Sequence, residues 1–186
     1  GSPASADDAI AHIRLAIQHL EAATVTLSLI GGLPGTGKST LAAGLADRTG
    51  AVIISSDVVR KELAGLEPRD PHPAPVYEGL YTPSITDHTY AEMLRRARKE
   101  LSAGRSVILD ASWCDPDLRE RARLLALLSY AELIQIECTV PESVSLHRIA
   151  TRLGNTSDAT REVYESMARR HRKWADAAIV DCTGGI

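Results

Sequence analysis

Short apolar segments alternate with amphipathic segments along most of this chain. Apolar segments rich in β-branched residues are typical of strands that are covered on both faces, and they occur at 24–30, 51–55, 106–110, 133–138 and 177–182. Apolar residues spaced three and four apart predict helices at 6–22, 38–48, 57–64, 85–101, 116–128, 142–152 and 160–174. This alternation predicts an α/β fold, a three-layer sandwich around a five-stranded parallel sheet.

Two segments interrupt the alternation. Residues 66–83 hold five of the nine prolines, which predicts a long irregular loop of the kind that is commonly functional. Residues 153–159 form a polar link between two predicted helices, and such a link suits a hinge. The only predicted domain boundary lies near residue 23, so we expect a connector helix within 1–23 and the main domain over 24–186.

The composition fits one globular domain, because the chain has 186 residues of which 44% are hydrophobic and 24% charged. No apolar run approaches the roughly 20 residues that cross a bilayer, and the N-terminus lacks the features of a signal peptide. We therefore expect a cytoplasmic protein without a membrane partner. The first two residues, Gly1 and Ser2, resemble the remnant of a cleaved tag. We therefore expect the natural chain to begin elsewhere and to be longer, and we interpret the helix at 6–22 as a connector from a further N-terminal domain.

The net charge of −3 gives no general attraction for nucleic acid. Arg95, Arg96, Arg98 and Lys99 form a basic run on one predicted helix, which a solvated helix face explains as well as a nucleic-acid site does. The chain has no phenylalanine, and aromatic residues make up only 4% of it, so few side chains could stack on bases. We expect no nucleic-acid partner.

A phosphate-binding loop follows the first predicted strand and precedes a helix, which is the context that the motif GxxxxGK[ST] requires. Its glycines allow backbone amides to surround phosphate oxygens, and the helix presents its unpaired N–H groups. Lys38 would reach the β- and γ-phosphates, and the Ser39 hydroxyl would bind Mg²⁺. The residues expected to bind the nucleotide are Gly32, Leu33, Pro34, Gly35, Thr36, Gly37, Lys38, Ser39 and Thr40.

Two carboxylates follow other predicted strands. Asp110 ends an apolar strand, as does the acidic residue that holds the magnesium shell in phosphate-loop enzymes; a turn residue is the alternative. Asp57 follows the second strand, with Arg60 three residues later on the same helical face. Asp57 could accept a proton from an acceptor hydroxyl, and Arg60 could hold an anionic substrate group. The alternative is that Asp57 or Ser56 caps a helix.

These residues resemble a known group of small P-loop kinases that includes gluconate kinase, shikimate kinase, the kinase domain of polynucleotide kinase and the zeta toxins. Within it, the chain is most similar to the ATP-binding domain that follows an aminoglycoside-phosphotransferase-like domain in two-domain actinobacterial proteins. The resemblance covers about 24–183 and is carried by the segments GGLPGTGKST, SSDVVRKEL, GRSVILDASW, DPDLRERA, RIATR and SDA.

The resemblance implies a nucleoside-kinase type of sheet with a lid, ATP and Mg²⁺ as cofactors, and phosphoryl transfer to a hydroxyl of a small-molecule acceptor. It makes Asp57 the general base and Arg60 a substrate contact. It also implies that Arg148 and Arg152 are lid arginines that approach the transferring phosphate, and that Arg119 binds substrate. From spacing alone, Arg148 and Arg152 share one helical face, which a solvated basic helix would also show.

Two other functions stay open at this point. One is a 5′-hydroxyl polynucleotide kinase, which shares the Asp57–Arg60 arrangement. The other is a non-catalytic module that senses ATP for an attached domain. The pairing of Asp57 with Arg60 favours transfer over sensing, because a sensor needs no base for an acceptor hydroxyl.

Overall fold

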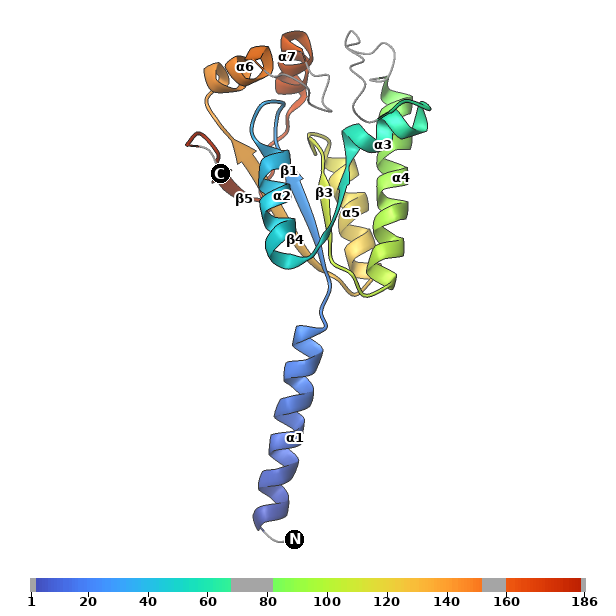
Figure 1. The fold of residues 1–186 in the computed structure, drawn as a ribbon, viewed down its shortest axis with the longest axis vertical. Helices are drawn as coiled ribbons and strands as arrows, with labels where there is room; N and C mark the ends of the chain where they lie inside the picture. The colour runs from blue at the N-terminus through green and yellow to red at the C-terminus, as the bar shows by residue number, and fades with distance from the viewer. Residues whose placement is uncertain (1–2, 68–81, 152–159, 185–186) are drawn as a thin grey trace.

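The computed structural model describes residues 3–67, 82–151 and 160–184. Five parallel strands form one sheet in the order β2-β3-β1-β4-β5, with helices on both faces (Figure 1). The strands are β1 (Thr26–Gly31), β2 (Val52–Ser55), β3 (Val107–Asp110), β4 (Glu132–Thr139) and β5 (Ala178–Asp181). The predicted α/β fold and its parallel sheet are confirmed.

Seven helices are described, and each lies close to its predicted range. They are α1 (Pro3–Ala22), α2 (Lys38–Thr49), α3 (Ser56–Leu63), α4 (Pro83–Ser102), α5 (Pro116–Leu128), α6 (Glu142–Thr151) and α7 (Arg161–Arg170). The largest difference is at α7, which ends at Arg170 rather than at residue 174, and the backbone of His171 leaves the helical conformation there.

Strands β1 and β3 are buried on both faces, which explains their largely apolar sequences. Leu27 and Leu29 of β1 belong to the larger apolar cluster, which also includes Met93 of α4 and Ala122 of α5. Ile30 belongs to a second cluster that includes residues of α2. Because successive side chains of a strand point to opposite faces, the two clusters are the two interfaces of the sandwich.

The strand order places β1 between β3 and β4, so the chain changes direction across the sheet at β1. In open parallel sheets, ligands bind beyond the carboxyl ends of the strands at such a point. The ends of β1, β2 and β3 lead into the phosphate loop, α3 and the segment before α5. The fold therefore brings all three predicted site segments to one edge of the sheet.

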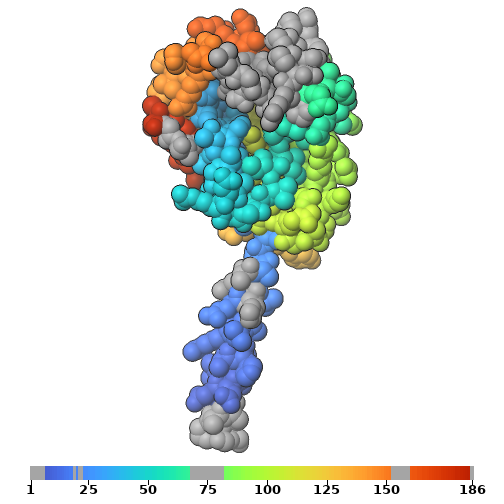
Figure 2. Space-filling model, viewed as in Figure 1, coloured from blue at the N-terminus to red at the C-terminus, as the bar shows by residue number. Residues whose placement is uncertain are grey.

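Helix α1 extends away from the body that the sheet and the other helices form (Figures 1 and 2). Its apolar residues are exposed, with 60% of Ile13 and 72% of Leu20 accessible to solvent. No helix among the described residues combines the length and apolar character needed to cross a membrane. The boundary near residue 23 and the connector role of 1–23 stay predictions.

Two of the sequence-based predictions fall outside the described residues. Most of the predicted proline-rich loop is among residues 68–81, and the predicted lid segment with Arg152 is among residues 152–159.

Candidate active site

The phosphate loop connects the end of β1 at Gly31 to the start of α2 at Lys38. Gly35 has a φ of +81°, and a Cβ atom there would lie 2.6 Å from the backbone oxygen of Ser145 in α6. Only glycine fits this close approach without a backbone shift. Inside the loop, the Lys38 Nζ and the Thr36 hydroxyl both donate to the Leu33 carbonyl, at 3.0 and 2.7 Å. The loop thus forms the compact turn that its motif predicts.

Ser39 and Asp110, the predicted magnesium residues, lie in contact. The Ser39 hydroxyl donates to Oδ2 of Asp110 at 2.8 Å. A hydroxyl and a carboxylate are ligands that suit Mg²⁺, which usually takes one or two protein groups plus phosphates and waters. Within the described residues, no group of three or more His, Cys, Asp or Glu could hold a metal by itself. The donor set therefore fits a metal that shares its shell with a nucleotide.

Burial raises the pKa of the Asp110 carboxyl above its ordinary value. The charge of Lys38 and the hydrogen bond from Ser39 act in the opposite direction, while the nearby charge of Asp57 raises this pKa further. Asp110 is thus a buried carboxylate beside one fixed cation and a second carboxylate. A bound divalent cation would stabilise the ionised form of such a carboxylate, because the cation compensates the buried negative charge.

Asp57 lies in the first turn of α3, and the N-cap position is Ser55, whose side chain makes no capping hydrogen bond. Neither Asp57 nor Ser56 is therefore the helix cap that the sequence left as an alternative. Instead, the Asp57 carboxylate pairs with the Arg60 guanidinium at 3.3 Å. The side chain of Arg60 is only 8% exposed, against 25% for Asp57. The pair holds Asp57 in place and keeps one side of it open to a ligand.

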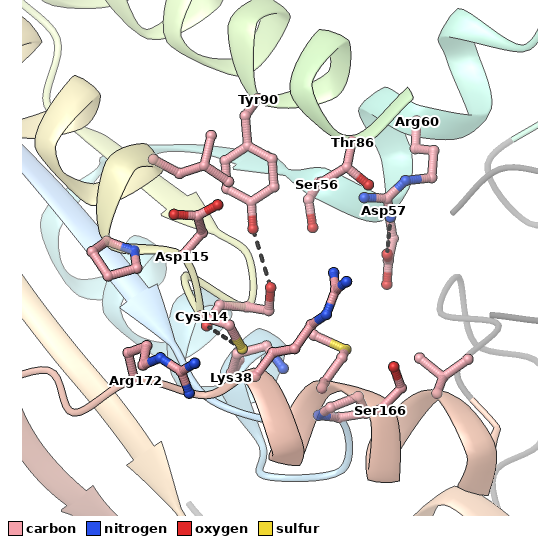
Figure 3. A pocket seen from close by; sticks show the side chains of 17 residues that line it. Lys38, Ser56, Asp57, Arg60, Thr86, Tyr90, Cys114, Asp115, Ser166 and Arg172 are labelled. Carbon is pink, nitrogen blue, oxygen red and sulfur yellow. Dashed lines mark hydrogen bonds and ion pairs between the residues drawn. The ribbon is translucent and has the colours of Figure 1, made fainter. Parts of the chain in front are cut away.

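A pocket of about 380 Å³ lies at this edge of the sheet (Figure 3). Its walls come from the phosphate loop, α3, α4, the β3–α5 connection, α7 and the segment that follows α7. Lys38, Asp57 and Arg60 all contribute to the lining, so the structure brings three predicted site residues together. The phosphate end of a nucleotide bound at the loop would meet a second ligand in this space.

Tyr90 follows the predicted proline-rich loop, where the sequence allowed either an acceptor pocket or ordinary loop packing, and it lines the pocket. Its hydroxyl is 3.2 Å from the Ser112 hydroxyl and accepts a hydrogen bond from the Trp113 N–H at 3.4 Å. Burial raises the pKa of the Tyr90 hydroxyl, and its ring packs edge-on against Trp113 with centroids 5.0 Å apart. Tyr90 therefore stays neutral and presents a fixed hydroxyl to the pocket wall.

Arg119 is buried and does not line the pocket. Its guanidinium donates to the backbone oxygen of Trp113 at 2.8 Å and to that of Arg172 at 3.5 Å. The same group lies over the ring of Trp174, 5.3 Å from its centroid. These contacts connect α5 to the pocket wall and to the segment after α7. The substrate-binding role that the resemblance implied for Arg119 stays a prediction.

Arg148 of α6 lies behind the phosphate loop. Its guanidinium donates to the backbone oxygens of Gly35 at 3.4 Å, Cys182 at 2.9 Å and Thr183 at 3.3 Å. It is not among the residues that line the pocket. In this arrangement Arg148 connects α6 to the phosphate loop and to the C-terminal segment, and its role as a lid arginine stays a prediction.

The pocket also contains two arginines that the sequence analysis did not assign, Arg170 and Arg172. Both belong to a basic stretch at 169–173 that the sequence displays plainly. From the sequence, this stretch indicates only that positive charge is concentrated there. Which of its side chains face the pocket depends on where α7 ends and how it packs, and neither is readable from the sequence.

The chain belongs to the AAA domain family, whose profile matches residues 27–174. It is 42% identical over 184 residues to the uncharacterized protein Rv2004c of Mycobacterium tuberculosis. The match covers 99% of this chain but 37% of that protein, so the chain spans little more than a third of its curated relative.

Solved kinase structures share the fold. A sugar kinase from Janibacter sp. HTCC2649 superposes with a TM-score of 0.62 at 18% identity, covering 84% of this chain and 85% of that one. A gluconokinase from Sinorhizobium meliloti 1021 superposes with a TM-score of 0.56 at 18% identity, covering 84% of this chain and 82% of that one. The Mycobacterium tuberculosis APS kinase CysC, in complex with AMPPNP and APS, superposes with a TM-score of 0.56 at 16% identity, covering 69% of this chain and 70% of that one. The predicted P-loop kinase-like fold is thus confirmed, while the narrower group assignment stays a prediction.

Proposed function

We propose that this domain transfers the γ-phosphoryl group of ATP to a hydroxyl of a small molecule. The observation that carries the proposal is that the Asp57 carboxylate and the Lys38 ammonium line the same pocket. A kinase needs a phosphate-binding cation and a proton acceptor on opposite sides of the transferring group. The kinases that share this fold support the same class of reaction.

In the proposed reaction, the phosphate loop binds the nucleotide and Lys38 contacts its β- and γ-phosphates. The acceptor hydroxyl enters the pocket beside Asp57, which takes its proton as the oxygen bonds to the γ-phosphorus. The bond between that phosphorus and the β–γ bridging oxygen breaks, and ADP leaves. Arg60 fixes the orientation of the Asp57 carboxylate through their ion pair.

Ser39 and Asp110 would hold Mg²⁺, which supplies neutralisation of the phosphate charge when it is bound. Arg148 and Arg152, as lid arginines, would add positive charge near the equatorial oxygens when α6 moves toward the nucleotide. We also propose Arg60 as a contact for the acceptor on the side away from Asp57.

Two observations support a small acceptor over a polynucleotide. Arg95 and Arg96 of the basic run pair with Glu92, and Arg96 also pairs with Glu62. These guanidinium groups are therefore largely neutralised by their own helix and its neighbour, which weakens any attraction for a phosphate backbone. The pocket of about 380 Å³ is of a size that suits a metabolite.

The decisive experiment compares the wild-type protein with Asp57→Asn. The acceptors are sugars, sugar acids, nucleosides and 5′-hydroxyl oligonucleotides, with γ-labelled ATP and Mg²⁺. We expect phosphorylation of a small acceptor that falls by roughly 10²-fold or more in Asp57→Asn, while nucleotide affinity stays near wild type. Asp47→Asn, on an exposed position of α2, is the matched control.

If Asp57→Asn transfers phosphate at the wild-type rate, Asp57 is not the base. If the wild-type protein binds ATP but phosphorylates no acceptor, the domain is a nucleotide-sensing module. Preferential phosphorylation of the oligonucleotides would instead identify a polynucleotide kinase.

A further inference from the structure

The charge of the pocket is opposite to that of the whole chain. The chain has a net charge of −3. Among the described residues that line the pocket, four are cationic and two are carboxylates, namely Lys38, Arg60, Arg170, Arg172, Asp57 and Asp115. A pocket with excess positive charge in a negatively charged protein favours an anionic ligand.

Most of these charges already have a role. In the proposed reaction Lys38 contacts the nucleotide phosphates, and Arg60 pairs with Asp57. The Asp115 carboxylate is the N-cap of α5 and accepts a hydrogen bond from the Asp117 N–H at 2.9 Å. Arg170 and Arg172 are the lining charges to which the proposed reaction gives no role, because the phosphate loop already binds the phosphates of the nucleotide.

Arg172 enters the pocket from the side opposite to Asp57 and Arg60 (Figure 3). No carboxylate of the described part of the chain forms an ion pair with its guanidinium. Its side chain is accessible to solvent, so it is a hydrated cation at the wall of the pocket. A ligand that reaches from Asp57 across the pocket would meet this guanidinium.

The backbone that carries Arg172 is anchored on both sides. Before it, the His171 Nε2 lies 2.8 Å from Oε1 of Glu137, a largely buried residue of β4. At Arg172 itself, the backbone oxygen accepts the hydrogen bond from Arg119. Carbonyl and carboxylate contacts of this kind fix the direction in which the intervening side chain leaves the backbone.

Trp174 provides the third anchor. Its indole N–H donates to Oε1 of Gln135 on β4 at 3.0 Å. Its ring packs against Gly31, where an added Cβ would be 2.2 Å from a ring carbon. The segment 171–174 is therefore held on β4 and β1, the two strands whose ends flank the phosphate loop. Arg172 is placed relative to the loop by rigid elements rather than by a surface loop.

We propose, building on the proposed kinase function, that Arg172 is a specificity-determining residue that binds an anionic group of the acceptor. Arg170, the last residue of α7, also lines the pocket. The guanidinium fork matches a carboxylate or a phosphate in two parallel hydrogen bonds. The acceptor then spans the pocket, with its hydroxyl at Asp57 and its anionic group at Arg172. Glu137 and Arg119 act as positioning residues for this contact.

The experiment compares matched charged and neutral acceptors. One pair is an aldonic acid with the alditol of the same carbon number, and the other is a sugar monophosphate with its free sugar. Each is assayed with wild type, Arg172→Ala, Arg172→Lys and the control Arg169→Ala. Arg169 is an exposed neighbour in α7 that does not line the pocket.

We expect the wild-type protein to prefer the charged member of one pair by at least about tenfold in kcat/KM. Arg172→Ala should lower kcat/KM for that member by roughly 10- to 100-fold, mainly through KM, and change the neutral member little. Arg172→Lys should recover part of the loss, and Arg169→Ala should change neither value. The preferred pair distinguishes a carboxylate from a phosphate.

Two other results would overturn the inference. If Arg172→Ala lowers kcat/KM equally for the charged and the neutral acceptor, or for neither, Arg172 does not bind an acceptor anion. The proposed kinase function would then stand without this inference. If the wild-type protein transfers phosphate to no member of either pair or of the broader acceptor panel, the proposed function itself fails, and this inference fails with it.

Discussion

The proposed nucleotide side and the proposed acceptor side of this site are built in different ways. The nucleotide side is one continuous segment, 32–40, completed by Asp110 at the end of the neighbouring strand. The acceptor side draws on α3, α4, the β3–α5 connection and the segment after α7, which are far apart in the chain. A continuous loop fixes its own geometry, whereas the acceptor wall depends on how separate elements pack. The same loop can therefore bind the same ligand in many proteins. The acceptor wall can change its specificity through substitutions in one element at a time.

The largest effect should come from Lys38→Ala on the nucleotide side. The variant loses the point charge that the loop offers to the β- and γ-phosphates, so transfer should fall by roughly 10³-fold or more. Nucleotide affinity should fall as well, as titration calorimetry with an ATP analogue would measure. Lys99→Ala, at an exposed position of α4, is the control. Normal turnover in a folded Lys38→Ala protein would contradict the assignment of the loop.

Asp110→Asn should separate function from stability on the same side. We expect transfer to fall by roughly 10²-fold, because the metal shell loses its carboxylate. Without nucleotide, however, the variant should be more stable than wild type at pH 7. The raised pKa of Asp110 means that the folded protein holds this proton more tightly than the unfolded chain does.

Ionisation of Asp110 therefore destabilises the wild-type fold as the pH rises above 3.8, the ordinary value of the carboxyl pKa. The stability advantage of Asp110→Asn should be largest near neutral pH and should shrink as the pH approaches 3.8. Urea unfolding at several pH values measures this difference. An advantage that grows toward low pH would contradict the burial argument.

Arg119→Ala tests whether this residue acts on substrate or on structure. Its loss leaves the buried carbonyl of Trp113 without its donor and removes the contact with Trp174. We expect the free energy of unfolding to fall by about 2 kcal/mol, which chemical denaturation would measure. A variant with wild-type stability and a selective rise in acceptor KM would instead support the predicted substrate-binding role.

Arg148 lies next to the phosphate loop but outside the pocket lining, and Arg148→Ala tests what it contributes. The three carbonyls that it binds belong to the phosphate loop and the C-terminal segment. We expect nucleotide affinity to fall by roughly tenfold through a less ordered loop. A further loss in kcat at saturating ATP would show that Arg148 also reaches the transferring phosphate. Unchanged affinity and kcat would make it a simple surface contact.

The smallest effect should come from Glu92→Gln on α4, away from the pocket. Hydrogen bonds from Arg95 and Arg96 lower the pKa of Glu92 to about 2, from an ordinary value of 4.5. The folded-state pKa is depressed, so this contribution to stability is complete above pH 4.5 and is lost as the pH falls toward 2. The ion pairs are partly exposed, so we expect a loss of less than about 1 kcal/mol at pH 7.

Thermal unfolding in low and high salt measures this loss, with Glu132→Gln at an exposed position of β4 as the control. The difference between Glu92→Gln and wild type should shrink in high salt and at pH 3. A loss of catalytic activity in this variant would contradict the separation of α4's basic run from the site.

The sequence by itself determined the order of the elements, the parallel sheet and the position of the phosphate loop. These follow from local signals, because apolar periodicity and glycine spacing act over a few residues. It also brought Asp57, Asp110 and the loop to one edge, since parallel strands end at the same side of a sheet. Even the Asp57–Arg60 pair was readable, as a spacing of three within a helix.

Only the tertiary structure decided the acceptor wall. Arg119 and Arg172 look alike in the sequence, yet one is buried against Trp174 and the other lines the pocket. Three features depend on packing between segments that are distant in the chain. They are the end of α7 at Arg170, the contact of Trp174 with Gly31 and the contact of the Tyr90 hydroxyl with Ser112. Such packing is set by the shapes of many side chains at once, which no short pattern encodes.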